Sequence, residues 1–387
     1  MLKSWKDSAS GVGGQLTAQK SQHNYALSPR HKIKKLDVRR CRLSVHAVPV
    51  TRDDWDRITD RLVVGSAIPF SVLVLPQVLQ NAVNMFSGQA CALSIISWEG
   101  YLSGLLGNTL MCTHFAGRTE RSAVNVQIIG IVNNMLVLFQ VALASFMPAP
   151  VFLATAGLTA LAVAISLNRL KGGLGQDPNS SKEVSQPQRA DHYKGGKMPF
   201  WSLWELIVGS AGLVAFVQVM SSVLQVGYDK GLFAGITIVL ALSAFVRVQM
   251  RNSEGRKMVS DIAHNLPGWA ATLLFALSPL PQLVRNFLEP SSLVGLSVGT
   301  MLLALTGNAL MFPRALYTRD IVWMAGSSWA CVAGWGQLLS MMLGKSVETG
   351  QSYLSLAPFA AVTAMLLSYV CGTLYFQNKF IQVLITT

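Results

Sequence analysis

Ten long hydrophobic segments, separated by shorter polar stretches, make up most of this chain. They lie near residues 62–84, 92–115, 123–146, 150–168, 201–225, 232–249, 266–288, 293–313, 321–343 and 353–376. Each is about 17–25 residues long, the length that an α-helix needs to cross the ~30 Å hydrocarbon core of a bilayer. The pattern predicts an all-α, polytopic membrane protein with about ten transmembrane helices.

The distribution of basic residues supports an even number of spans. With ten spans, fifteen Lys and Arg residues beyond residue 61 fall on the side that holds both termini, and three fall on the opposite side. Loops that stay on the side of insertion carry an excess of Lys and Arg. We therefore expect both termini to face the compartment from which the protein inserts.

Two sequence markers recur in the same order. The pattern Leu-Pro-Gln-x-x-x-Asn occurs at 75–81 and again at 280–286, and Gly-Asn-x-Leu-Met occurs at 107–111 and at 307–311. They predict an internal repeat that pairs spans 1–3 with spans 7–9. Because an offset of six spans is even, the two units enter the membrane in the same direction, as in transporters built from parallel repeats.

The prolines and amides of these markers are the candidate functional residues. Proline removes a helical hydrogen bond, so Pro76 and Pro281 predict kinks that could act as hinges, the first by freeing the carbonyl of Val72. Amides both donate and accept hydrogen bonds, which suits a neutral sugar. The predicted substrate-binding residues are Gln77, Asn81, Trp98, Tyr101, Asn108, Gln282, Asn286 and Asn308. Two alternatives stay open: the amides could join helices to one another, and Trp98 could be an interfacial anchor.

Composition and charge narrow the class further. The chain has 387 residues, of which only 13% are charged, and its net charge is +13. Residues 1–50 hold ten Lys and Arg against two Asp, so most of the excess comes from this arm and does not indicate nucleic-acid binding. The arm is basic, poor in acids and without an apolar run, which predicts a cleaved organellar transit peptide; a basic tail that stays on the protein is the alternative.

Enzymatic and metal chemistry find no support in the sequence. Five cysteines are scattered without metal-ligand spacing, and the sequence contains no His-Glu-x-x-His, phosphate-binding loop or Gly-x-Ser-x-Gly motif. We predict no catalytic residue, metal or cofactor. Acids within the apolar segments are few, chiefly Glu99 and Glu205, which argues against a steeply ion-coupled pump.

The predicted organisation has seven parts. They are a transit peptide (1–50), an amphipathic lead (51–61), a first transmembrane repeat with a linker helix (62–168), a disordered loop (169–200), linker helices (201–249), a second transmembrane repeat (266–376) and a tail (377–387).

Several strings resemble the maltose-excess family of chloroplast maltose exporters. The resemblance runs from about residue 62 to 376 and is carried by residues 75–77, 104–108, 268–273, 307–316, 319–320 and 326–330. It implies a carrier in the inner envelope that exports maltose from starch breakdown. One departure is Phe216-Val217-Gln218, where the family pattern has Leu-Pro-Gln.

We therefore predict a facilitated carrier that moves maltose or a similar neutral sugar by alternating access, without a cofactor. Its partners would be the sugar and membrane lipid, with no nucleic acid and an open oligomeric state. The alternatives are a Pro-Gln-loop amino-acid carrier of an acidic organelle, and a membrane sorting receptor or scaffold of the same fold.

Overall fold

A computed structural model describes residues 51–89, 93, 98–172, 200–223, 228–251, 253–277, 279–288, 293, 297–345 and 350–386. The chain divides into two units, Met1–Pro49 and Val50–Thr387. The predicted transit peptide and most of the predicted disordered loop at 169–200 lie outside the described residues.

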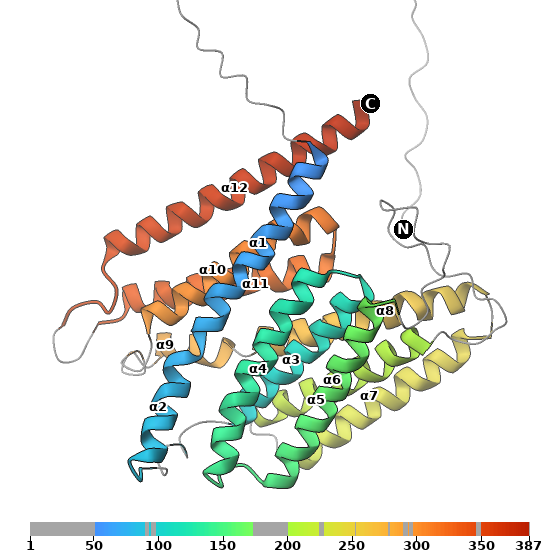
Figure 1. The fold of residues 1–387 in the computed structure, drawn as a ribbon, viewed down its shortest axis with the longest axis horizontal. Coiled ribbons are helices and arrows are strands. Elements are labelled where there is room, and N and C mark those ends of the chain that lie inside the picture. The colour runs from blue at the N-terminus through green and yellow to red at the C-terminus, as the bar shows by residue number, and fades with distance from the viewer. Residues whose placement is uncertain are drawn as a thin grey trace, which may run out of the picture. The chain divides into compact units, whose positions relative to one another are not determined.

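The described residues form helices, with one isolated bridge between Lys345 and Ser352 and no strand, which confirms the all-α class (Figure 1). The helices are α1 (Arg52–Leu73), α2 (Leu75–Phe86), α3 (Trp98–Gly117), α4 (Arg121–Leu143), α5 (Ala149–Leu170), α6 (Phe200–Val223), α7 (Tyr228–Gln249), α8 (Ser253–Leu277), α9 (Leu280–Leu288), α10 (Val298–Thr318), α11 (Ile321–Leu343) and α12 (Leu356–Thr386).

Every one of the ten predicted apolar segments overlaps at least one of these helices. Within the described part of the chain, five stretches are long and apolar enough to cross a membrane. They are Arg52–Phe86, Arg121–Leu143, Ala149–Leu170, Phe200–Ser221 and Leu356–Asn378. The structure therefore supports a membrane protein, and the total of ten spans stays a prediction.

The predicted amphipathic lead forms the beginning of helix α1. Thr51 caps α1, because its hydroxyl accepts from the backbone N–H of Asp54 and the Asp54 carboxylate accepts from the backbone N–H of Thr51. Asp53 and Asp54 also place negative charge at the positive end of the helix dipole. Residues 51–61 therefore continue without a break into the apolar part of α1.

Both Leu-Pro-Gln motifs lie at helix breaks. The α-helix that begins at Arg52 is interrupted at Val74, and α2 starts with Pro76 in its first turn, where proline costs no hydrogen bond. In the second motif α8 ends at Leu277 and α9 begins at Leu280. The breaks occur where the prolines predicted them, and their action as hinges stays a prediction.

Pro76 was predicted to free the carbonyl of Val72, and the structure shows that a different carbonyl is bonded outside its own helix. The carbonyl of Val72 accepts from the backbone N–H of Val74, so it stays within the turn. The carbonyl of Phe70 accepts instead from Nδ2 of Asn133 on α4, at 2.9 Å. The exposed carbonyl lies two residues earlier than a simple proline kink implies, and a neighbouring helix satisfies it.

Helices α1–α4, the first helix set, and α8–α11, the second helix set, pack in the same way. Within each set the first helix contacts the fourth (α1 with α4, α8 with α11), and the third contacts the fourth (α3 with α4, α10 with α11). Each first helix also packs on the third helix of the other set: α1 on α10, as Figure 1 shows, and α8 on α3. In this reciprocal packing, which we call the exchange of helices, each set provides its first helix to the third helix of the other, and this supports the predicted repeat.

The remaining helices flank the two sets. Helix α5 packs on α3 and α4, α12 packs on α10 and α11, and α6 packs between α7, α8 and α3. The main hydrophobic core joins both sets: Phe115 of α3 meets Trp323 of α11 edge to face, with 4.6 Å between ring centroids. Both rings are fully buried, so the sets are held together by packing as well as by polar contacts.

Candidate functional site

Two glycine–phenylalanine contacts join the helix sets at equivalent positions. Gly107 of α3 lies against the ring of Phe275 on α8, and Gly307 of α10 lies against the ring of Phe70 on α1. A β-carbon at either glycine would come within 2.7 Å of the ring, closer than such atoms approach. The glycine of each Gly-Asn motif is therefore needed for the close approach of two helices from different sets.

The two asparagines that follow these glycines turn toward their own helices. Nδ2 of Asn108 donates to the carbonyl of Gly104 at 2.8 Å, and Nδ2 of Asn308 donates to that of Ala304 at 2.9 Å. Asn108 also fills the space over Gly130 on α4, where a β-carbon would come within 2.5 Å of its Oδ1. Both side chains are half-buried.

Helix α4 makes the reciprocal contact to α3. Nδ2 of Asn134 donates to the carbonyl of Gly130 at 2.8 Å, and the Asn134 side chain lies over Gly104 on α3. Each helix thus presents a Gly-x-x-x-Asn pair to the other, and each amide covers the partner's glycine. This geometry favours a packing role for Asn108, and sugar contact by either asparagine stays a prediction.

The amide stripe of the first Pro-Gln motif forms a hydrogen-bonded chain between α2 and α4. Nε2 of Gln77 donates to Oδ1 of Asn81 at 2.7 Å, and Nδ2 of Asn81 donates to Oε1 of Gln140 at 3.0 Å. Nε2 of Gln140 in turn donates to the carbonyl of Val78 at 3.0 Å. Asn81 is 1% exposed and both ends of its amide are in use, which fits the helix-joining alternative.

The second motif repeats this contact. Nδ2 of Asn286 on α9 donates to Oγ of Ser340 on α11 at 3.0 Å, and Asn286 is also buried. Ser340 is 200 residues beyond Gln140, so equivalent helices are joined at equivalent places. The side chains of Gln282 and Pro281 lie outside the described residues. Trp98 and Tyr101, in the first turn of α3, are half-buried and pack on the main core.

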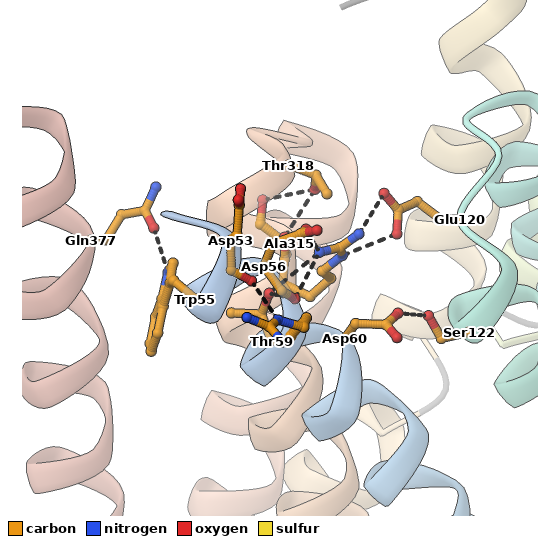
Figure 2. Close-up of polar contacts among 12 residues, drawn as sticks. Asp53, Trp55, Asp56, Thr59, Asp60, Glu120, Ser122, Ala315, Thr318 and Gln377 are labelled. Carbon is orange, nitrogen blue, oxygen red and sulfur yellow. Dashed lines mark hydrogen bonds and ion pairs between the residues drawn. The ribbon is translucent and has the colours of Figure 1, made fainter. Parts of the chain in front are cut away.

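A half-buried arginine links the two helix sets at the end of the molecule where α1 begins. Arg314 of α10 meets both carboxylate oxygens of Glu120, Nε to Oε2 at 3.1 Å and Nη2 to Oε1 at 3.3 Å. Its Nη1 also contacts the carboxylate of Asp56 and lies 3.4 Å from the hydroxyl of Thr59. Figure 2 shows Asp56 and Thr59 on α1 with Glu120 opposite them. The arginine therefore ties α10 to both α1 and the start of α4.

A second polar contact, with the base in the first helix set and the acid in the second, joins α3 to the start of α11. Nε2 of His114 lies 2.9 Å from Oδ2 of Asp320, and Nε of Arg118 forms an ion pair with the same oxygen at 2.9 Å. Nη2 of Arg118 donates to Oδ1 of Asn265 on α8 at 2.7 Å. His114 and Asp320 are essentially unexposed, whereas Arg118 keeps some contact with solvent.

The two contacts are reciprocal by residue number. His114 and Arg314 are 200 residues apart, as are Glu120 and Asp320, and each base reaches the acid of the other set. The turns between them match as well: Thr119 and Arg319 both have left-handed backbones, with φ of 58° and 55°. We call this group the basic-end latch; it consists of Asp56, His114, Arg118, Glu120, Arg314 and Asp320.

The pKa values of the latch acids Asp320 and Glu120 shift in opposite directions. Burial raises the pKa of Asp320, but the hydrogen bond and charge of His114 and the charge of Arg118 outweigh burial and lower it to about 2. Asp320 also accepts from the backbone N–H groups of Val322 and Trp323, which anchors it as the cap of α11. Burial raises the pKa of Glu120, and Arg314 offsets only part of that rise. Asp320 therefore stays ionised at every physiological pH.

Sequence reasoning missed the latch, although a signal was present. Each Gly-Asn motif is followed by a base and then, six residues after that base, by an acid: His114 with Glu120, and Arg314 with Asp320. Of these four residues, only Arg314 entered the count of basic residues in the loops. Their pairing across the two sets depends on the exchange of helices, which the motif alone does not show.

Family models of known proteins match an N-terminal and a C-terminal part of this chain. Residues 50–174 match the family model "Maltose excess protein 1 N-terminal domain". A protein of Oryza sativa subsp. japonica, "Maltose excess protein 1-like, chloroplastic", is 35% identical over 333 residues, which cover 84% of this chain and 76% of the relative. This chain belongs to the maltose excess protein 1 family.

Further matches agree with this family. The Arabidopsis thaliana protein "Maltose excess protein 1, chloroplastic" is 34% identical over 321 residues, covering 82% of this chain and 69% of the relative. Residues 263–313 match the model "PQ loop repeat", which places the second Pro-Gln motif within a recognised repeat unit. The resemblance that the sequence motifs indicated is thus confirmed. No solved structure matches the chain.

A cavity of about 390 Å³ lies away from the latch in this family member. Residues of α10, α11 and α12 line it, among them Phe312, Cys331, Trp335 and Tyr369. Its walls are almost entirely apolar, so it does not suit a sugar, whose hydroxyls would lose their hydrogen bonds to water there. None of the predicted substrate-binding residues lines it.

Proposed function

We propose that this protein is a facilitated carrier that exports maltose, or a similar neutral sugar, across the inner envelope membrane of the chloroplast. Support comes from the family and from the relatives, whose names carry both maltose excess and the chloroplast. Apolar helices long enough to span a bilayer and the scarcity of buried acids agree with passive sugar transport. The acid-poor basic arm at 1–50 fits import into a plastid.

The observation that carries the mechanism is the exchange of helices between the sets. Because α1 packs on α10 and α8 packs on α3, each set holds one helix of the other. If the sets rock against one another, the two exchanged interfaces must open and close together. Alternating access in transporters with parallel repeats works by such rocking around a central site.

The basic-end latch fits one end of that cycle. The latch has two arms, one formed by Arg314 with Glu120 and the other by Arg118 with Asp320. Both arms close the interface between the helix sets at the end that carries the basic loops. We infer that the structure represents a carrier closed at this end, and that both arms must separate for sugar to pass. The breaks before Pro76 and Pro281 would let the rest of α1 and α8 move while α2 and α9 keep their bonds to α4 and α11.

The sugar path is proposed to run between the sets at the level of the two glycine–phenylalanine contacts. Phe70 and Phe275 offer aromatic faces for the C–H groups of a sugar ring, and Asn108 and Asn308 lie one residue from the contacting glycines. Each asparagine uses an Nδ2 hydrogen for its own helix. Its Oδ1 could still accept from a sugar hydroxyl if the neighbouring helix moves away.

A ligand scan of the purified protein tests this function. A ligand that binds only the folded protein raises its melting temperature, and the rise grows with the ratio of ligand concentration to Kd. Maltose should stabilise the protein at millimolar concentration, while amino acids should not. Stabilisation by an amino acid alone would favour the amino-acid carrier. Binding of maltose without its exchange across a vesicle membrane would favour a receptor.

A further inference from the structure

The apolar cavity between α10, α11 and α12 is large enough to hold part of a ligand. Its volume is about 390 Å³. Pockets that bind small organic ligands measure about 300–1,000 Å³. Apolar walls of this extent take up hydrocarbon in preference to water, because water finds too few hydrogen-bond partners there. The cavity therefore suits an apolar occupant.

The walls offer almost no polar atom to such an occupant. Nε1 of Trp335 donates to Oγ1 of Thr363 at 3.0 Å, and that hydroxyl donates to the carbonyl of Phe359 at 2.9 Å. The hydroxyl of Tyr369 is shielded by the surrounding protein. Trp335, Tyr369 and Phe312 thus line the space with their rings and carbon atoms. What these walls recognise is hydrocarbon, and not a sugar or a charged headgroup.

The cavity lies at the middle of the helices that form it. Helix α12 contains the stretch Leu356–Asn378, which is long and apolar enough to cross a membrane and has its middle at residue 367. The lining residues of α12 fall between Thr363 and Val370. They therefore lie within roughly 6 Å of that middle along the helix axis. Because the hydrocarbon core extends about 15 Å to either side of the bilayer centre, lipid tails reach this depth and headgroups do not.

The mouth of the cavity faces outward between α11 and α12. Val332 of α11 and Leu367 of α12 both line the cavity, and each is 59% exposed. Phe312 and Cys331 line it as well and are half-buried, so they form its inner wall. The exposed apolar surface of a spanning helix faces lipid. A hydrocarbon chain can therefore enter from the bilayer without passing the polar ends of the helices.

The first helix set has protein at the equivalent place. The residues 200 positions before Phe312 and Cys331 are Cys112 and Ile131. These are only 1% and 6% exposed, and α5 packs on the two helices that carry them. Helix α12 packs on the corresponding helices of the second set but encloses a cavity with them. The two sets therefore differ in how they are covered.

We propose that this cavity binds one acyl chain of a membrane lipid, which fills the space between α12 and the second helix set. The apolar walls, the place at mid-membrane depth and the mouth toward lipid all fit a hydrocarbon tail. Two long parts of the chain outside the described residues, 1–50 and 173–199, are rich in charged and polar residues and do not match such walls. Lipid binding here is separate from the proposed sugar path and does not depend on it.

Photolabelling of the full-length protein in phosphatidylcholine vesicles tests this site. One probe is a phosphatidylcholine with a diazirine at the end of an acyl chain, and a second probe carries the diazirine next to the headgroup. Labelled residues are identified by peptide mass spectrometry. The chain-end probe should label Ala309 and Phe312 on α10, and the headgroup probe should not. Leu158, near the middle of α5 and 69% exposed, reports contact of the chain-end probe with bulk lipid.

A matched pair of variants separates entry into the cavity from general contact with lipid. Val332→Trp places a large ring in the mouth and should abolish labelling of Ala309 and Phe312. Val132, 200 residues earlier on α4, is 57% exposed and lies outside the cavity, so Val132→Trp should leave the labelling unchanged. Both side chains are exposed, and a melting curve shows that each variant is folded. If Val332→Trp does not fold, Leu367→Trp closes the same mouth from α12.

Several results would overturn the lipid site. They are the absence of label at Ala309 and Phe312 in the unmodified protein, labelling that persists in a folded variant with a closed mouth, and equal labelling by the headgroup probe. Loss of the label in Val132→Trp would also count against it. Exchange of labelled maltose on the same vesicles tests the proposed function independently, so either can fail without the other.

Discussion

Removing the charge of Glu120 should open the basic end of the carrier. Glu120 receives Arg314 through both carboxylate oxygens, at 3.1 and 3.3 Å. The substitution Glu120→Gln keeps the size and one acceptor but leaves the arginine without its main buried counter-charge. Asp56 is 44% exposed by side chain and so compensates only in part.

The expected magnitude follows from the burial of this pair. The side chains of Arg314 and Glu120 are 12% and 15% exposed, so solvent screens them little. Truncating one partner of a buried, hydrogen-bonded charge pair costs about 2–5 kcal/mol. Because some exposure and Asp56 remain, we take the lower limit of about 2 kcal/mol. That corresponds to a shift of roughly 30-fold from the closed toward the open form.

The assay reads the exposure of a thiol beneath the latch. Thr59, Ser66 and Phe70 lie on one face of α1, and the first and last of them contact α10. Ser66 is fully buried between them, so Ser66→Cys in a background without other cysteines reports opening. Its labelling by an impermeant reagent should be roughly 30-fold faster with Glu120→Gln than without it.

A control comes from another charge pair on the same helix. Arg57 pairs with Asp54 at 2.7 Å, but its side chain is 68% exposed, and such surface pairs contribute about 0–1 kcal/mol. Arg57→Gln should leave the labelling of Ser66→Cys unchanged. Equal effects of Arg57→Gln and Glu120→Gln, or no effect of Glu120→Gln in a folded protein, would refute the latch.

Four further outcomes are expected. Gly307→Ala forces its β-carbon against Phe70 and should lower the free energy of unfolding by about 1–3 kcal/mol, seen as a lower melting temperature that Phe70→Leu partly restores. Asn81→Ala leaves buried hydrogen-bond partners unpaired and should lower the free energy of unfolding by about 1–3 kcal/mol, seen as a lower melting temperature. Its maltose affinity should stay the same. Pro76→Ala should slow maltose exchange without weakening binding, and unchanged turnover would contradict the hinge. Deletion of residues 1–45 should abolish import into isolated chloroplasts but keep exchange in vesicles; lost exchange would make the arm part of the carrier.

The sequence predicted the helical class and the places where two helices break. Both depend on local properties: long apolar runs specify spanning helices, and proline cannot continue a helix without losing a hydrogen bond. The family was also recognisable, because strings such as residues 307–316 are specific. These features survive in any arrangement of the helices, so no knowledge of packing was needed to find them.

The roles of individual polar residues were less accessible. The Gly-Asn motif indicated close approach and a polar contact, but not in which direction each residue points. In the structure Gly107 faces α8, whereas Asn108, about 100° further around α3, faces α4. Asn81 was read as a cavity residue, yet Gln140, 59 residues away, completes its hydrogen bonds. Such contacts depend on helix rotation and on long-range pairing, which a local pattern does not contain.

Counterflow of labelled maltose tests the central claim most directly. Full-length protein in vesicles preloaded with unlabelled maltose should take up external labelled maltose transiently, and vesicles preloaded with an amino acid should not. Glu120→Gln should change the rate while the protein remains folded. Absence of maltose counterflow from protein that melts cooperatively, or counterflow of amino acids in its place, would contradict the account of this protein as an alternating-access maltose carrier.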